Sequence, residues 1–153
     1  MNLLCFIKFN FIIVFFLIFL GCKNNTNYLH NFDENRWDFR DSVTFKFNIP
    51  DSSKTKNIAF FLRNTLEYPY QNIFLITTMS HKGIVVQADT AEYLIADKYG
   101  RWLGRGFGEN RDNYFIFNEK TRFENSGEYM ITVLHGMRKN PLVGVNKIGL
   151  KIQ

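Results

Sequence analysis

Strict alternation of apolar and polar side chains in the segment Ser42–Ile49 restricts this chain to a β fold more than any other feature of its sequence. The apolar positions are Val43, Phe45, Phe47 and Ile49. A period of two residues places them on one face of an extended strand, whereas a helix would spread them around its axis. Turn residues follow in Pro50-Asp51-Ser52-Ser53. The segment is therefore predicted to be a strand with one face in a core.

Short apolar segments separated by turn residues continue to the end of the chain. The further predicted strands are Asn57–Arg63, Ile73–Met79, Ile84–Gln87 and Glu92–Ala96 (two short strands or one bent strand), Asn113–Asn118, Gly127–His135 and Asn146–Ile152. The best helical candidate, Thr90–Tyr99, also fits a strand. About eight short strands with turns every 8–12 residues predict an all-β, antiparallel sandwich of the immunoglobulin or jelly-roll kind.

The sequence Asn125-Ser126-Gly127-Glu128-Tyr129 enters one of these strands and is similar to the tyrosine corner of immunoglobulin-like sandwiches. In that corner a Tyr hydroxyl bonds back to the backbone of the preceding turn. We therefore expect the Tyr129 hydroxyl to bond to the backbone just upstream of it.

The first 22 residues differ in composition from the rest. Lys8 is the one charged residue before Leu20, and ten uninterrupted apolar residues run from Phe11 to Leu20. Ten residues at a rise of 1.5 Å cover about half of a ~30 Å hydrocarbon core, so a stable transmembrane span fits poorly. A basic head, an apolar stretch and a small residue, here Gly21, form the layout of an export signal.

The sequence Leu20-Gly21-Cys22 resembles the end of a bacterial lipoprotein signal, although Phe19 stands where that family usually has Leu. The resemblance implies that the Cys22 thiol is acylated, that the peptide is cut before Cys22, and that the new amino terminus is acylated too. Membrane lipid would then be the first partner of the chain. The alternatives are an ordinary signal peptide or a membrane anchor that contains a cysteine.

The predicted organisation has three parts: a signal peptide (residues 1–21), a polar, lipid-anchored tether (22–35) and a single sandwich domain (36–153). Cys5 and Cys22 are the two cysteines of the chain, so the domain holds no disulfide framework and no zinc-thiolate site. Removal of the signal peptide takes away Lys8 and leaves 18 of the 19 basic residues and 14 acidic residues, a net charge of +4. That charge forms no basic stripe, which argues against nucleic acid as a partner.

Residues that could carry out catalysis or bind a metal have no suitable second residue nearby in the sequence. The three histidines do not have the spacing of metal ligands; they are His30, His81 and His135. The densest acidic cluster is Asp89, Glu92 and Asp97, with no nucleophile or histidine beside it. We expect turn caps and solvent-facing strand positions there, although a hydrolase that uses Asp89 and Glu92 remains an alternative. The sequence thus predicts a protein that is not an enzyme and has no metal and no cofactor.

The glycine-rich run Gly104-Arg105-Gly106-Phe107-Gly108 has the wrong spacing for a phosphate-binding loop, and no helix follows it. It fits a bent strand or edge loop where the backbone passes closely or turns.

Aromatic residues in or beside the predicted loops are the candidate partner-binding set. They are Tyr68, Tyr70, Tyr99, Trp102 and Phe107. Such residues can stack on sugar rings or anchor a protein partner when they are exposed. They can equally fold inward and close the ends of the sandwich.

A series of short motifs occurs in order across residues 30–153. It includes Phe32-Asp33, Phe45-Lys46-Phe47, Tyr68-Pro69-Tyr70-Gln71-Asn72, Trp102-Leu103-Gly104-Arg105-Gly106-Phe107-Gly108, Gly127-Glu128-Tyr129 and Gly149-Leu150-Lys151-Ile152. Together these motifs resemble the GldH family of gliding-motility lipoproteins of Bacteroidetes. The resemblance implies an envelope lipoprotein needed for gliding, linked to type IX secretion, with other envelope proteins as partners. It implies no catalytic residue and no cofactor.

Two functional hypotheses of different classes follow. The first is a non-catalytic subunit of a gliding and secretion apparatus. The second is a lipid-anchored, carbohydrate- or peptide-binding sandwich, suggested by Tyr99 and Trp102. The segment Lys23–Asn27 has no acidic residue, so we expect the anchor in the outer membrane, facing the periplasm.

Overall fold

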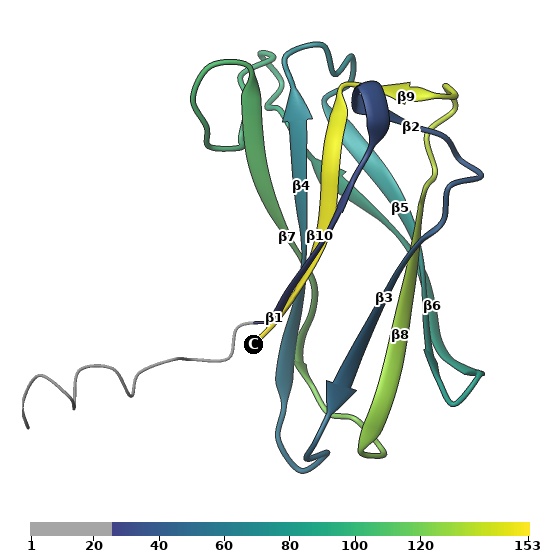
Figure 1. The fold of residues 1–153 in the computed structure, drawn as a ribbon. Helices are drawn as coiled ribbons and strands as arrows, with labels where there is room; N and C mark the ends of the chain where they lie inside the picture. Colours follow the sequence, from purple (N-terminus) through teal and green to yellow (C-terminus); the bar gives the residue numbers. More distant parts are fainter. Residues whose placement is uncertain (1–25) are drawn as a thin grey trace, which may run out of the picture.

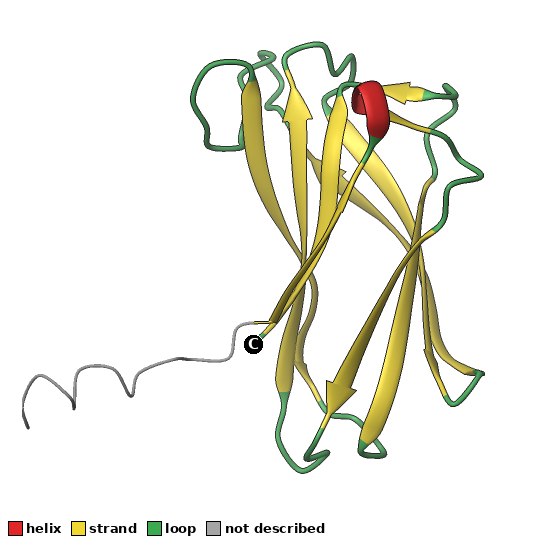
Figure 2. Cartoon of the chain, in the orientation of Figure 1, coloured by secondary structure: helices red, strands yellow, loops and turns green. Residues whose placement is uncertain are grey.

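Residues 26–153 are the part of the chain that this computed structural model describes, and most of them belong to β-strands (Figures 1 and 2). The one helical element in this range is a 3₁₀ turn, η2 (Asp33–Asn35), and no helix there is long and apolar enough to cross a membrane. The predicted signal peptide (1–21) and the predicted acylation site Cys22 lie outside the described residues.

The strands form two four-stranded sheets and one short ribbon. Sheet 1 contains, in order across the sheet, β1 (Thr26–Asn31), β10 (Val145–Ile152), β4 (Lys56–Thr65) and β7 (Asn110–Thr121). Sheet 2 contains β3 (Val43–Ile49), β8 (Gly127–His135), β5 (Asn72–His81) and β6 (Ile84–Leu94). The ribbon pairs β2 (Arg36–Trp37) with β9 (Leu142–Val143).

The order of the strands identifies the sandwich as a jelly roll. Counted along the chain without β2 and β9, the eight long strands lie in the order 1-8-3-6 in sheet 1 and 2-7-4-5 in sheet 2. All pairings are antiparallel. β5 and β6 form a hairpin, and every other connection between consecutive long strands crosses to the opposite sheet. The prediction of an all-β, antiparallel sandwich is confirmed, and of its two forms the jelly roll is the one observed.

Two predicted strands are confirmed closely because each has one face in the core and one in solvent. Burial alternates along β3, so that Phe45 and Phe47 are buried while Lys46 between them is exposed. β8 has the predicted bounds. The two segments expected around Ala88-Asp89-Thr90 form the single strand β6, and the β5–β6 register shifts between Met79 and Ser80.

The tether predicted for residues 22–35 is wrong over most of its length. Residues Thr26–Asn31 form β1, which pairs along its whole length with β10. Phe32 follows it into the core, where its ring stacks on Trp37 with centroids 4.7 Å apart. An edge strand has one face in solvent and needs few apolar side chains. The polar sequence of β1 therefore gives no apolar–polar alternation from which a strand would be predicted. The folded domain therefore includes residues 26–35 and does not begin at residue 36.

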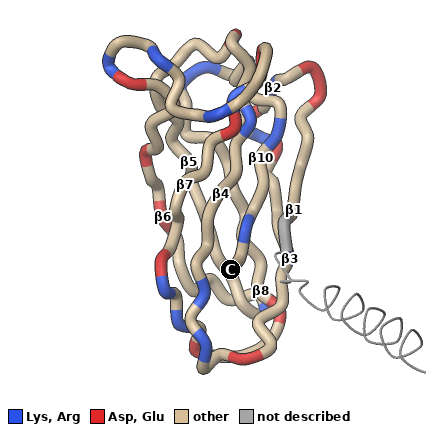
Figure 3. Tube along the Cα trace, turned by 90° about the vertical axis from the view of Figure 1, so that its left-hand side faces the viewer, with Lys and Arg blue, Asp and Glu red and all other residues tan. Residues whose placement is uncertain are grey.

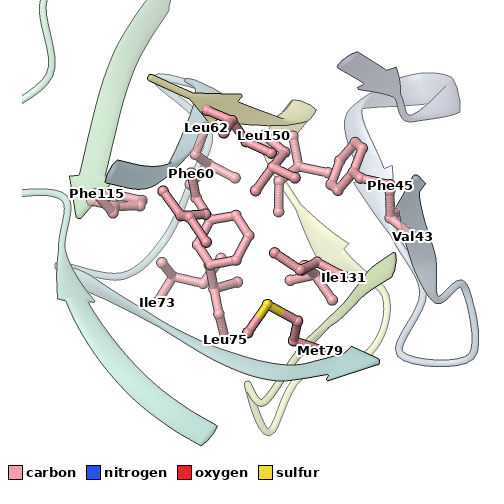
Figure 4. Close-up of a cluster of buried hydrophobic side chains, with 14 of the residues drawn as sticks. Val43, Phe45, Phe60, Leu62, Ile73, Leu75, Met79, Phe115, Ile131 and Leu150 are labelled. Carbon is pink, nitrogen blue, oxygen red and sulfur yellow. The ribbon is translucent and has the colours of Figure 1, made fainter. Parts of the chain in front are cut away.

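Apolar side chains from the inner faces of both sheets fill the space between them (Figure 4). Sheet 1 contributes Phe60, Leu62, Phe115 and Leu150, and sheet 2 contributes Val43, Phe45, Ile73, Leu75, Met79 and Ile131. These residues are buried. This contact supplies the hydrophobic stabilisation that holds the sheets face to face.

Aromatic rings close the end of the sandwich that contains the β3–β4, β5–β6 and β7–β8 turns, which we call the turn end. Tyr129 is central: His81 stacks on it at 4.4 Å between centroids, and Phe123 meets it edge-on at 4.7 Å. The Tyr129 hydroxyl donates to the Asn125 carbonyl oxygen at 2.9 Å. The tyrosine-corner hydrogen bond expected from the sequence is thus present.

The opposite end, which we call the loop end, is closed by the β2–β9 ribbon and by the β4–β5 connection. Trp37 is fully buried there, and its indole N–H donates to the Asp41 carbonyl oxygen at 2.9 Å. His135 meets the Trp37 ring edge-on, with centroids 5.4 Å apart. The His135 ring nitrogens are buried without a hydrogen-bond partner in the described protein. Burial therefore lowers the pKa of His135.

The alternation of β3 predicts opposite effects of two adjacent substitutions. Phe47→Ala should lower the free energy of unfolding by about 3–5 kcal/mol, the usual cost of truncating a buried Phe. That is a large part of a total of about 5–15 kcal/mol. Lys46→Ala should change it by less than about 0.5 kcal/mol, since surface substitutions are nearly silent. Urea unfolding of both variants checks this, and equal effects would contradict the inward orientation of Phe47.

The buried imidazole of His135 predicts a pH dependence of stability. Its pKa is lower in the folded than in the unfolded protein, so protonation favours the unfolded chain. The free energy of unfolding should therefore fall as the pH drops below about 6.5, the ordinary pKa of histidine. His135→Phe should flatten this dependence relative to the wild type in urea titrations at several pH values. Parallel pH profiles of the two proteins would show that His135 does not contribute.

Candidate functional site: the groove beneath the β6–β7 loop

A long connection, residues 95–109, joins β6 at the edge of sheet 2 to β7 at the edge of sheet 1. Its first residue, Ile95, is fully buried and fixes the start of the loop to the core. The Ile95 N–H donates to the Gln71 carbonyl oxygen at 2.7 Å, and the Leu103 N–H donates to the Ile95 carbonyl oxygen at 2.9 Å. The loop therefore leaves and re-enters the sandwich at fixed points of the loop end.

The glycines of this loop allow its backbone to lie directly on β7. A Cβ atom on Gly106 would lie 2.1 Å from the Asn110 carbonyl oxygen, and one on Gly104 would lie 2.6 Å from the Asn113 Oδ1 atom. Between them, backbone hydrogen bonds link Arg105 and Asp112 in both directions, at 2.7 and 3.0 Å. The expectation that these glycines mark a close backbone approach is confirmed.

Buried amide side chains hold β4 and β7 together beneath the loop. Asn113 donates from Nδ2 to Oδ1 of Asn64 at 2.9 Å, and Asn64 donates from its Nδ2 to the Thr65 carbonyl oxygen at 2.9 Å. On the outer side, the Arg63 guanidinium binds both carboxylate oxygens of Asp112. Satisfied polar networks of this kind make the support of the loop rigid.

An open groove of about 610 Å³ lies between the loop and the two edge strands. Leu94, Leu103 and Tyr114 form apolar walls and stay 54–64% exposed. At Gly104 and Gly106 the backbone itself lines the groove, and Arg105 and Asp112 add charged side chains to its lining. Large exposed apolar side chains around a fixed hollow are typical of surfaces that contact another molecule. The arrangement can seat an apolar side chain of a partner; it brings together no acid–base pair.

The loop also presents two largely exposed aromatic rings. Phe107 is 99% exposed and Tyr99 is 72% exposed. Lys98 Nζ and the Arg101 guanidinium carbon lie 5.0 and 5.4 Å from the Tyr99 ring centroid, distances at which cations attract an aromatic face. Trp102 is half-buried and packs against the core. The structure thus brings three of the five predicted aromatics into one loop and leaves two of them free for a partner.

The other two predicted aromatics, Tyr68 and Tyr70, lie in the β4–β5 connection and point inward. Tyr68 is 4% exposed, and its hydroxyl donates to the Asn72 carbonyl oxygen at 2.8 Å. Burial raises the pKa of Tyr68 well above its usual range. Tyr70 is half-buried, and its ring meets that of Tyr68 edge-on at 6.0 Å. For this pair the inward alternative, closure of the end of the sandwich, describes the structure.

Sequence reasoning missed the walls of the groove. The segment Asn113–Asn118 carried a signal for one of them: Tyr114 and Ile116 alternate with Phe115 and Phe117, so the strand is apolar on both faces. An edge strand needs apolar side chains only on the face that packs in the core. Apolar residues on its outer face therefore indicate a surface that contacts something else. Leu94 and Leu103 meet this surface only through the crossing from sheet 2 to sheet 1, which no local pattern reveals.

The candidate catalytic acids lie apart. Asp89 and Glu92 are exposed and three residues apart on β6, so that their side chains leave opposite faces of the strand. Glu92 accepts a hydrogen bond from Asn72 Nδ2. Asp97 caps the turn after β6 by accepting from the backbone N–H groups of Arg101 and Tyr99, and these bonds lower its pKa.

The histidines are distributed over the described strands. His30 is exposed on β1, while His81 and His135 are buried at the ends of β5 and β8. Within residues 26–153, no group of three or more His, Cys, Asp or Glu side chains is placed to hold a metal ion.

Comparisons with known proteins relate the whole described domain to one family. A family model described as GldH lipoprotein matches residues 24–152. A protein of Christiangramia forsetii, "Gliding motility lipoprotein GldH homolog", is 31% identical over 151 residues, covering 94% of this chain and 93% of that protein. "Gliding motility lipoprotein GldH" of Flavobacterium johnsoniae is 28% identical over 124 residues, covering 76% and 77%.

Among solved structures, dimeric latent PorU from Porphyromonas gingivalis aligns with 84% of this chain and 12% of its own, at 11% identity and a TM-score of 0.33. A likeness at that level carries no functional information. The match to the family model spans most of the sequence, and the relative from Christiangramia forsetii aligns along nearly its whole length. The chain therefore belongs to the GldH lipoprotein family.

Proposed function

We propose that this protein is a lipid-anchored, non-catalytic component of the cell-envelope machinery for gliding motility and of the type IX secretion linked to it. The observation that carries the proposal is family membership along nearly the whole chain, with relatives that are named gliding motility lipoproteins. The separation of Asp89 from Glu92 supports the absence of acid–base catalysis, because the two carboxylates leave opposite faces of β6.

The anchor is the Cys22 side chain, acylated after cleavage behind Gly21. Its position suits this role, because β1 begins at Thr26, only four residues later, and so ties the folded domain closely to the lipid. Several acyl chains, each gaining ~0.8 kcal/mol per buried CH₂, hold a protein stably on a bilayer. We place the anchor in the outer membrane with the domain in the periplasm.

The partner of the groove is another envelope protein. Phe107 and the exposed groove walls, among them Leu103, provide the aromatic and apolar contacts that protein interfaces concentrate at their centres. Of the two residues that suggest a carbohydrate- or peptide-binding module, Tyr99 is exposed but Trp102 is half-buried against the core, so the two rings do not form one stacking platform for a sugar. This burial favours a protein partner over a carbohydrate ligand.

A gene deletion complemented with loop variants tests the proposal. The deletion should abolish surface spreading and type IX-dependent secretion, and the wild-type gene should restore both. Leu103→Ser combined with Phe107→Ser should fail to restore spreading. Truncating a central anchor costs about 2 kcal/mol, and thus lowers affinity by about 30-fold. A crosslinked pull-down with the wild-type protein should capture an envelope protein that the double variant fails to capture.

The matched control combines Ile84→Ser with Val85→Ser. These residues are as exposed as Leu103 but lie on β6 at the turn end, away from the groove. The control should restore spreading fully. Normal spreading and secretion in the clean deletion would refute the function, and full activity of the loop variant would refute the groove as the contact.

The anchor predicts the behaviour of Cys22→Ser. Lipoprotein-type cleavage requires prior acylation of the cysteine, so the variant should retain its signal peptide and run about 21 residues heavier, in line with the length of such signals. It should also fail to take up labelled palmitate. Cys5→Ser should change nothing, since Cys5 lies in the removed segment. Cleavage of Cys22→Ser at the same bond, with retention at the membrane, would contradict the lipid anchor.

A further inference from the structure

The strands of the two sheets carry opposite net charges. Those of sheet 1 contain six Lys or Arg and two Asp or Glu, a net charge of +4. Those of sheet 2 contain one Lys and three Asp or Glu, a net charge of −2. β1, β4 and β10 have no acidic residue, and Asp112 on β7 is paired with Arg63. Figure 3 shows the charged residues from the side of sheet 1.

The outward face of sheet 1 is also apolar at its centre. One row of cross-strand partners consists of Leu29, Gly149, Phe61 and Tyr114, and the next consists of Lys151, Ala59 and Ile116. Leu29, Tyr114 and Ile116 are 58–64% exposed. A Cβ atom on Gly149 would lie 2.6 Å from Leu29 Cδ2, so glycine lets the Leu29 side chain lie across β10. We call these two rows, with Lys147 beside them, the sheet 1 face.

The first described strand, β1, is an edge strand of the same sheet. Thr26 begins β1 and pairs with Ile152, which pairs with Ile58. The row of Lys151 and Ile116 is the next one along the strands. Thr26 is the fourth residue after Cys22, so their Cα atoms can be at most about 14 Å apart. An acylated Cys22 therefore brings the bilayer surface close to this edge.

We propose that the sheet 1 face lies against the surface of the bilayer that holds the acylated Cys22. Leu29, Tyr114 and Ile116 would enter the interfacial region, where tyrosine is favoured. Lys147 and Lys151 would face anionic phospholipid headgroups, which attract basic residues near a membrane. The inference rests on the proposed lipid anchor and adds an orientation to it.

This contact leaves the groove available to a partner except at Tyr114, which the groove shares with the sheet 1 face. β7 begins at the loop end with Asn110 and reaches Ile116 six residues later, toward the turn end. The groove lies around the beginning of β7, and Tyr114 lies at the boundary between the groove and the sheet 1 face. The β6–β7 loop itself lies beyond that boundary.

A competing apolar segment exists on the other sheet. Ile84, Val85 and Val86 are 50–70% exposed at the start of β6. β6 is the edge strand of the acidic sheet 2, and β1 lies in sheet 1 at the edge away from the β6–β7 connection. The charge and the position of the anchor therefore favour the sheet 1 face, and the segment Ile84–Val86 is the alternative that the experiment must separate.

Environment-sensitive labels on the full lipoprotein test the orientation. In a Cys5→Ser background, where Cys22 is acylated, single cysteines are introduced as Ile116→Cys, Val85→Cys and Lys46→Cys, and each is labelled with a nitrobenzoxadiazole fluorophore. All three positions are exposed, so the fold should tolerate them, and circular dichroism verifies it. The proteins are reconstituted into vesicles of phosphatidylethanolamine and phosphatidylglycerol, and quenching by aqueous iodide is measured.

The label at position 116 should be several-fold better protected from iodide than the label at position 46 on the same vesicles, and its emission should lie at shorter wavelength. The labels at positions 85 and 46 should stay exposed. Equal quenching at all three positions on vesicle-bound protein, or protection at position 85 alone, would overturn the inference while leaving the anchor intact. Protection at position 116 without palmitate incorporation would support the face and refute the anchor.

Charge reversal provides a second, independent measurement. Lys151→Glu should reduce the protection of the label at position 116, because it opposes the anionic headgroups. Lys46→Glu makes the same charge change on sheet 2 and should leave the protection unchanged. Raising the ionic strength to about 1 M shortens the Debye length to about 3 Å and should act like Lys151→Glu. Equal effects of the two substitutions would show that sheet 1 does not face the lipid.

Discussion

The inner faces of the two sheets interdigitate at a spacing of about 10 Å, and no strand could keep its place in this jelly roll without that contact. Phe60 and Leu62 from sheet 1 meet Leu75 and Ile131 from sheet 2, all of them buried (Figure 4). Because six of the connections between long strands cross from one sheet to the other, the loops at both ends depend on this packing for their positions. The β6–β7 loop, whose first residue Ile95 is part of the core, is the clearest case.

The groove and the sheet 1 face share a structural element. β7 runs from one to the other, and the Arg63–Asp112 ion pair lies between them. A protein held by lipid at one end of a sheet and by a partner at the other would have a defined tilt. Rigid support from the buried Asn64–Asn113 pair fits such a role, because a partner site on a fixed scaffold loses little conformational entropy on binding.

The sequence predicts those strands that bury one face in the core and expose the other face to solvent. β3 and β8 alternate cleanly and were predicted almost to the residue. The sequence does not reveal β1, because an edge strand can be polar. It leaves β6 open between two short strands and one bent strand, because β6 is exposed on both faces along much of its length. In the candidate site, the glycine spacing correctly predicted close backbone approach. The groove walls could not be predicted, because Leu94, Leu103 and Tyr114 meet only through a crossing between sheets.

The pairing of β1 with β10 joins the first described strand to the last one. β1 has no other neighbour in its sheet, and β10 separates it from β4. Sheet 1 therefore cannot be completed until the final residues of the chain are available, which makes its assembly non-local and slow compared with hairpin formation. In a chain that emerges from a membrane amino terminus first, sheet 1 could therefore close only after β10 has emerged on the far side.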